Sequence, residues 1–303
     1  MIALDCPSGA KYMVETMYLP ERVSYQKREG EVMNKWLAVV IALAVLCGTA
    51  LAGEVPKEPI LRIETGMHTT QIRRVGVDSA GRYLVTASDD KTLRVWDIAT
   101  GQAVSTIRPP AGGTNEGMLF AVAISPDGNV IAAGGWTGAE WDGTVSIYLF
   151  ERTSGRMIKK IGGLPNVIFH LVFSKDGRYL VATLGGNNGL RVFRTSDYSL
   201  SAQDKEYGDR SNWADFDASG RLVTSSWDGY IRLYDAGFRL IAKVKGNSGK
   251  QPFAVSFSPD GAKVAVGYGD STGVDVLNGR DLRHLYSPDT KGLSKNNLNK
   301  LMG

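Results

Sequence analysis

The chain has 303 residues, of which 43% are hydrophobic, and a formal net charge of +4. This length and apolar content are enough for an all-β domain with a full core. The 35 basic and 31 acidic residues are interspersed, so we expect no nucleic-acid partner. Both cysteines, Cys6 and Cys47, precede the expected start of the mature chain. This excludes disulfides, thiolate catalysis and cysteine metal ligands from the mature product.

The first 52 residues have the pattern of an export signal preceded by an extension. Residues 1–32 show no clear period and mix charges, and we interpret them as an upstream extension, untranslated or unstructured. Met33-Asn34-Lys35 then opens an apolar run that ends in Ala50-Leu51-Ala52. A short basic start, an apolar core and an A-x-A site predict a signal peptide over residues 33–52, with Met33 as initiator and cleavage after Ala52. We therefore expect an exported protein, periplasmic or extracellular, with no membrane insertion after cleavage.

Two other interpretations of this segment are weaker. A retained membrane anchor would use residues 36–52, which are barely long enough to span and lack a basic stop-transfer flank. A lipoprotein would be acylated at Cys47, but Leu46 stands where such signals have a small residue. Residues 53–59 follow as an extended linker with two prolines, and Ile60–Glu64 is a short β-prone run.

A unit of three short β-prone runs separated by turns recurs along the chain, first at Val75–Asp97. One turn of each copy ends in glycine, and these residues are Gly81, Gly128, Gly177, Gly220 and Gly261. They lie 47, 49, 43 and 41 residues apart. A period of about 40–45 residues is typical of the four-stranded blades of a β-propeller. We predict an all-β fold with about five blades over residues 60–287, followed by a polar tail at 288–303.

The third run of most copies ends in an aromatic residue, which suits the wedge-shaped gap between neighbouring blades. We place Trp96, Tyr148, Phe193 and Tyr234 at this position, and the fifth copy has Val276-Leu277 instead.

These residues resemble the WD-repeat family of β-propellers, in its exported bacterial type. Gly66 and His68 match the family's Gly-His start with one residue inserted. Ser88, Asp90 and Trp96 match its second-strand serine, turn aspartate and third-strand tryptophan. The resemblance implies that His68, Ser88, Asp90 and Trp96 form a buried structural relay.

The resemblance also bears on how the ring closes. Family members commonly have seven blades, so five copies imply a truncated ring, with a genuine five-bladed ring as the alternative. The run at Ile60–Glu64 resembles the outer strand that closes such rings. In a truncated ring it would lack its partner, and the open edges would favour aggregation.

The residues show no constellation that carries chemistry. His68, His170 and His284 share no predicted face, and we interpret them as structural. Zinc would need clustered His and Cys, and Asp89-Asp90 lacks the spacing of a calcium loop. The glycine-rich stretch 185–189 lies between strands, where a phosphate cradle would need a helix. We therefore expect no catalytic residues, metal or cofactor, and no enzyme activity.

A surface signal remains in the second copy, where an insertion carries two tryptophans in a glycine-flanked loop. Trp136 and Trp227 align with Asp89, in a turn expected on the face of the blade-to-blade connections. An aromatic patch at the channel mouth would serve a partner. We assign partner binding to Trp136, Glu140, Trp141, Trp213 and Trp227. The alternative is that each tryptophan packs against its neighbouring blade.

The predicted function is a non-catalytic scaffold that presents loops around a channel to a protein partner. Two alternatives come from other classes. One is the sensing half of a larger enzyme, such as a caspase-like peptidase fusion. The other is a propeller hydrolase or carbohydrate-binding domain, which would need convergent acids or histidines in the channel.

Overall fold

The computed structural model describes residues 66–138 and 143–293. The extension, the signal peptide, the linker, the run at Ile60–Glu64, Glu140, Trp141 and the tail from residue 294 lie outside the described residues. Within the described ranges, no helix is long and apolar enough to cross a membrane.

The described residues form five antiparallel sheets of four strands each, with each strand beside the next in sequence. The first sheet contains β1 (Ile72–Val77), β2 (Tyr83–Ser88), β3 (Leu93–Asp97) and β4 (Ala103–Ile107). The second contains β5 (Leu119–Ile124), β6 (Val130–Gly135), β7 (Val145–Glu151) and β8 (Met157–Leu164). The third contains β9 (Ile168–Phe173), β10 (Tyr179–Leu184), β11 (Leu190–Arg194) and β12 (Leu200–Asp204), with the short 3₁₀ helix η2 (Gly186–Asn188) before β11. The fourth contains β13 (Ser211–Phe216), β14 (Leu222–Ser226), β15 (Tyr230–Tyr234) and β16 (Leu240–Lys245). The fifth contains β17 (Pro252–Phe257), β18 (Lys263–Tyr268), β19 (Val274–Asn278) and β20 (His284–Tyr286).

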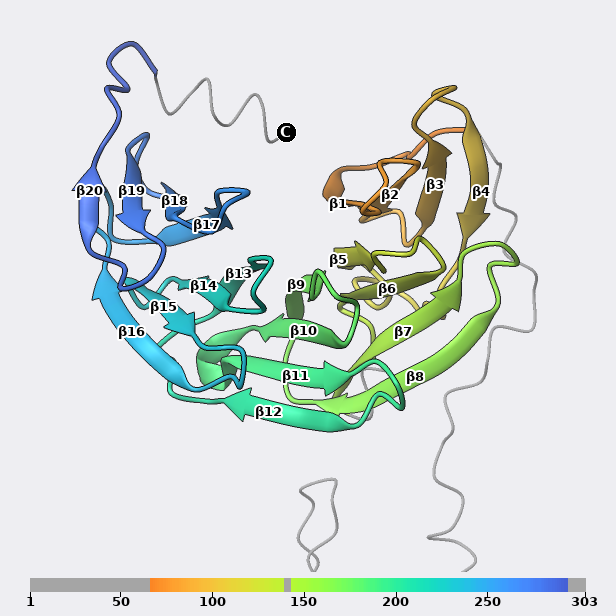
Figure 1. Ribbon diagram of the computed structural model, residues 1–303. Coiled ribbons are helices and arrows are strands. Elements are labelled where there is room, and N and C mark those ends of the chain that lie inside the picture. Colours follow the sequence, from red (N-terminus) through yellow and green to blue (C-terminus); the bar gives the residue numbers. More distant parts are fainter. Residues whose placement is uncertain (1–65, 139–142, 294–303) are drawn as a thin grey trace, which may run out of the picture. The chain divides into compact units, whose positions relative to one another are not determined.

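The five sheets follow one another around an open arc (Figure 1). The first strands of the sheets, β1, β5, β9, β13 and β17, face its centre, and we call them the inner strands. The predicted all-β fold with five four-stranded blades is confirmed, as an incomplete propeller.

The turn glycines explain why the repeats are detectable. All five adopt the left-handed backbone, with φ from +65° at Gly81 to +84° at Gly220. Glycine adopts this conformation without a steric penalty, so the hairpin between the first two strands of each sheet ends the same way in every copy.

The core lies between sheets, in four buried clusters, one for each pair of neighbours. Phe150 of the second sheet packs in the cluster shared with the first sheet, and Phe193 and Tyr234 pack correspondingly against the second and third. Tyr148, which was predicted to hold this position, packs in the same cluster, but strand pairing makes Phe150 the equivalent of Trp96. Phe150 pairs with Ile131 as Trp96 pairs with Leu84, so the insertion shifts the second copy by two residues.

The first sheet has one face without a neighbouring sheet among the described residues. Val75 and Val77 on β1 are 58% and 50% exposed. Their counterparts in the second sheet, Val122 and Ile124, are 2% and 5% exposed because they pack on the first sheet. This contrast shows that the arc is open at β1.

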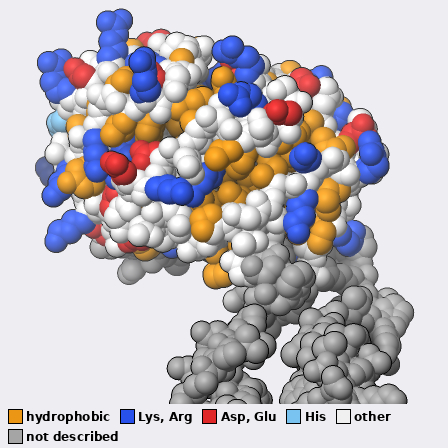
Figure 2. All heavy atoms as spheres, turned by 90° about the horizontal axis from the view of Figure 1, so that it is seen from below, with side chains coloured by type: hydrophobic (Ala, Val, Ile, Leu, Met, Phe, Trp, Pro, Cys, Tyr) orange, Lys and Arg blue, Asp and Glu red, His pale blue; other side chains and the backbone are white. Residues whose placement is uncertain are grey.

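The outer strands, which are the fourth strands of the sheets, also expose apolar side chains. Figure 2, seen from below Figure 1, shows hydrophobic patches between Lys and Arg side chains. The exposed apolar residues of these strands include Met157, Ile158, Leu200, Leu240 and Ile241.

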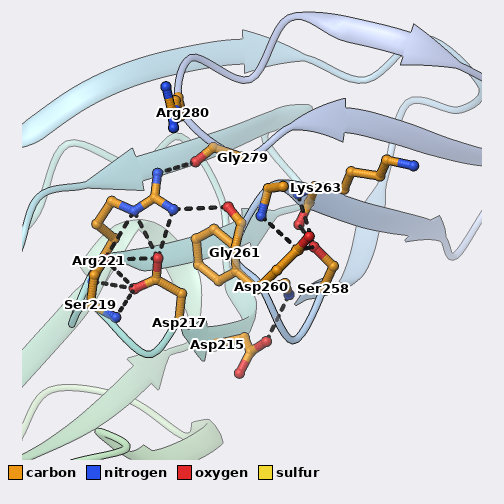
Figure 3. A network of polar contacts seen from close by, with 12 residues as sticks. Asp215, Asp217, Ser219, Arg221, Ser258, Asp260, Gly261, Lys263, Gly279 and Arg280 are labelled. Carbon is orange, nitrogen blue, oxygen red and sulfur yellow. Dashed lines mark hydrogen bonds and ion pairs between the residues drawn. The ribbon is translucent and has the colours of Figure 1, made fainter.

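Neighbouring sheets are also joined at their inner hairpin turns. Asp217 opens the fourth sheet's turn and binds Arg221 at 2.7 Å. The Arg221 guanidinium donates to the backbone oxygens of Gly261 and Gly279 in the fifth sheet (Figure 3). Arg82 repeats this arrangement from the first sheet to the second, because it pairs with Asp78 and donates to the Asp127 oxygen.

Candidate functional site at the channel mouth

Each inner strand carries a β-bulge near its start, where the register with the second strand shifts by one residue. The five bulged residues are Arg73, Phe120, Phe169, Asn212 and Phe253. Bulges leave one residue out of the ladder and re-aim its side chain. The repeat therefore aims five equivalent side chains at one place.

All five bulged residues line a single cavity of about 950 Å³, which we call the channel mouth. The other lining residues are Arg74, Trp136, Arg210 and the segment 70–72. This volume is at the upper end of the range for small-molecule sites, about 300–1,000 Å³. No aspartate or glutamate lines the mouth within the described part of the chain.

Arginines at the mouth lie against aromatic rings. The Arg73 guanidinium is 5.2 Å from the centre of the Phe120 ring, and that of Arg210 is 3.2 Å from the centre of Trp227. Arg210 also lies 4.9 Å from the Phe169 ring. Such cation–π contacts contribute about 0.5–2 kcal/mol each and hold the guanidinium groups in place.

Arg74 crosses the channel from the first sheet. Its Nη2 donates to the backbone oxygens of Phe169 (3.3 Å) and Asn212 (3.4 Å), in the third and fourth sheets. Burial lowers the pKa of Arg74 to about 10, so it remains charged at neutral pH. Its guanidinium lies 4.1 Å from the centre of Trp213.

His170 completes this group beneath the mouth. Its ring stacks on Trp213 at 4.4 Å, and its Nδ1 accepts a hydrogen bond from the Ala214 amide. Burial, together with the Arg74 charge, lowers the pKa of His170 well below its usual range. His170 is therefore a neutral structural group at physiological pH.

The predicted tryptophans are placed differently from one another. Trp136 lines the mouth and is 44% exposed. Trp227 occupies the equivalent turn position, because the amides of both residues bond the residue before their own inner strand. It lies beneath Arg210 and close to Gly269 of the fifth sheet. Trp213 lies on β13 below the mouth, and Glu140 and Trp141 fall outside the described residues.

The relay residues of the first sheet meet at a threonine. The His68 ring bonds Asp90 Oδ2 through Nδ1 (2.9 Å) and Thr86 Oγ1 through Nε2 (2.7 Å). Trp96 Nε1 donates to the same threonine oxygen at 3.0 Å. The assignment of Ser88 is corrected: its hydroxyl contacts Thr70 and accepts from the Asp90 amide. Thr86 and Ser88 share a sheet face, but only Thr86 lies within reach of His68.

Asp90, His68 and Thr86 are connected like an acid, a base and a nucleophile. However, Thr86 is 4% exposed and its oxygen also bonds Trp96. A nucleophile must be reachable by substrate, so this arrangement is structural. In the fourth sheet, Tyr207 bonds both Thr224 and Tyr234, which builds a similar link from other side chains.

Other chemistry finds little support in the described part of the chain. No three His, Cys, Asp or Glu side chains there could hold a metal ion. His284 bonds Ser287 at 3.0 Å and lies 3.7 Å from Asp275, away from the mouth.

The bulged residues and the mouth arginines were not predicted from the sequence. A signal does exist, because each bulged residue lies eight positions before the turn glycine of its own copy. Three of these five positions are phenylalanine.

Comparison with known proteins finds a repeat family that matches parts of this chain. The model of the WD domain, G-beta repeat, matches residues 61–97, 106–148 and 210–235. Over these residues the chain is similar to the WD-repeat family.

Curated relatives are similar to this chain over part of its length. Telomerase protein component 1 of Mus musculus is 28% identical over 210 residues, 68% of this chain and 7% of that protein. Its Rattus norvegicus counterpart is 26% identical over 211 residues, again 68% of this chain and 7% of that protein. A Ribosome biogenesis protein BOP1 homolog of Drosophila erecta is 52% identical over 40 residues, 13% of this chain and 5% of that protein. The chain thus spans a small fraction of the relatives it matches.

Proposed function

We propose that this chain is a non-catalytic interaction scaffold that binds a protein partner at the channel mouth. The observation that carries the proposal is the convergence of five equivalent bulged side chains on one cavity. Aromatic and arginine side chains in such a cavity are the residue types that dominate binding energy at protein interfaces. The WD repeats and the relatives' names, a telomerase component and a ribosome biogenesis protein, support a role within assemblies.

The test identifies a partner with the full chain as bait and then measures its affinity with purified proteins. Phe120→Ala and Phe253→Ala remove apolar contacts at the mouth. Leu200→Ala and Ile241→Ala remove exposed apolar side chains from β12 and β16 and are the matched controls. We expect at least about tenfold weaker binding for the mouth variants, equivalent to about 1.4 kcal/mol, and unchanged binding for the controls. The reverse pattern would place the interface on the outer strands and refute the proposal.

We also propose that Met33 to Ala52 directs export of the chain. The proposal is supported by the basic start, apolar run and A-x-A site of this segment. Fractionation of cells that express the full gene, with sequencing of the mature N-terminus, tests it. We expect Gly53 as the first residue of an exported product, and a cytoplasmic product that keeps residues 33–52 would contradict it.

A further inference from the structure

The channel mouth has charged donors without matching acceptors. Among the described residues, Arg73 alone of the three mouth arginines has a carboxylate partner, Asp89, at 2.7 Å. Within that part of the chain, Arg74 and Arg210 form no ion pair. Their Nε atoms are buried there without a hydrogen-bond acceptor, and so is Nε1 of Trp227. Two of these three residues, Arg74 and Arg210, line the mouth, and Trp227 lies beneath Arg210.

This arrangement is costly for the free protein. A buried donor without an acceptor destabilises a protein, and a buried charge without a partner destabilises it more. An anionic group that enters the mouth would offset the charges of Arg74 and Arg210, which line it. For Arg74 the nearby polar groups do not replace it, because Arg74 reaches only backbone oxygens and His170 is neutral. Arg210 has the charge of Asp209 nearby, but Asp209 does not line the mouth.

The rings at the mouth favour a carboxylate over a nucleic acid. Single-stranded nucleic acids bind by stacking bases on aromatic faces. Here the phenylalanine rings that line the mouth, Phe120, Phe169 and Phe253, each already have a guanidinium near the ring, at 5.2, 4.9 and 5.8 Å. The arginines that line the mouth carry a planar guanidinium group, whose fork of N–H donors matches a carboxylate.

We propose that the channel mouth binds an acidic peptide segment, with Arg74 and Arg210 donating to its carboxylate groups and the bulged phenylalanines contacting its apolar side chains. This inference rests on the proposed function and names the chemistry of the partner. The cavity of about 950 Å³ has room for a few residues of extended chain.

The test selects peptides from a random heptapeptide library with the full chain as bait. We expect enrichment of Asp and Glu over the input library. The affinity of an enriched peptide, measured by fluorescence anisotropy, should fall about tenfold or more in Arg74→Gln and in Arg210→Gln, as for a hydrogen bond to a charged group. Arg239→Gln removes the same charge from a residue that is 85% exposed, and should leave the affinity unchanged. Circular dichroism confirms that each variant is folded.

The opposing outcomes are distinct. Enrichment of neutral or basic peptides, no enrichment, or equal affinity in Arg210→Gln and Arg239→Gln would overturn the inference. Tighter binding of an oligouridine than of the selected peptide would overturn it in favour of a nucleic acid. If Phe120→Ala weakens binding of the natural partner while Arg74→Gln and Arg210→Gln do not, the scaffold function stands and the acidic-peptide inference fails.

Discussion

The guanidinium of Arg74, on the inner strand of the first sheet, lies 4.1 Å from the centre of the Trp213 ring on the inner strand of the fourth. These two sheets are not neighbours in the arc, so the contact crosses the channel beneath the mouth. It connects the stability of the arc to the site that we propose for the partner.

Replacement of Trp213 by alanine should therefore be strongly destabilising. The change removes a large partly buried ring together with its contacts to Arg74 and His170, and we expect a loss of about 3–5 kcal/mol in the free energy of unfolding. Trp136→Ala, at a 44% exposed ring, should cost less than about 1 kcal/mol. Urea unfolding followed by circular dichroism measures both, and an equal loss would show that the channel contact is not structural.

The relay of the first sheet should depend on Thr86 rather than Ser88. Thr86→Val keeps the shape of the side chain but leaves His68 Nε2 and Trp96 Nε1 without their shared oxygen. We expect it to cost about 2–3 kcal/mol, and Ser88→Ala about 1 kcal/mol. Thermal and urea unfolding of the two variants rank them, and a larger effect at Ser88 would restore the original assignment.

Asp275 should make the fold sensitive to acid. Burial acts to raise its pKa, but hydrogen bonds from Ser248, Tyr268 and Ser287 outweigh burial and lower the pKa to about 2. An aspartate in the unfolded chain titrates near 3.8. The stabilisation of the fold by these bonds is therefore fully present above about pH 5 and is lost as the pH falls towards 2. The stability advantage of the wild type over Asp275→Asn should shrink by about 1 kcal/mol between pH 7 and pH 3. An advantage that is constant in urea titrations across this range would contradict the assignment.

The clamp at Arg221 should be worth more than an exposed ion pair. Arg221 is 20% exposed, pairs with Asp217 and donates to two backbone oxygens of the next sheet. We expect Arg221→Ala to cost about 2 kcal/mol. Arg239 is also paired with an aspartate four residues earlier, but it is 85% exposed. Arg239→Ala should therefore lower the free energy of unfolding by at most about 0.5 kcal/mol. Chemical unfolding compares them, and similar losses would mean that the contacts to the fifth sheet contribute nothing.

The repeat was readable from the sequence because its turn glycines need a left-handed backbone that other residues adopt at a cost. Their spacing predicted five sheets and most third-strand aromatics correctly. Tyr148 was misplaced because the insertion before β7 shifts the register, and a side-chain count across a loop of unknown path cannot detect this shift. Thr86 and Ser88 lie two residues apart on the same face of β2. The sequence pattern therefore cannot tell which of them contacts His68, and only their distances from His68 in the structure can.

The mouth was harder to predict because a β-bulge depends on how two strands pair. Phe120, Phe169 and Phe253 look like ordinary apolar strand residues in a linear pattern. Arg74 contacts residues about 95 to 138 positions away in the chain, and no local rule connects them. The tryptophan hypothesis placed Trp136 and Trp227 at equivalent turns, as the structure has them, and missed the arginines at the mouth.

The bulges also separate two demands on the sequence. A bulged residue does not take part in the ladder that holds its sheet together, so its side chain can change while the backbone pairing on either side persists. The five positions at the mouth can therefore be exchanged as a set, in evolution or by design, to recognise a different ligand on an unaltered framework.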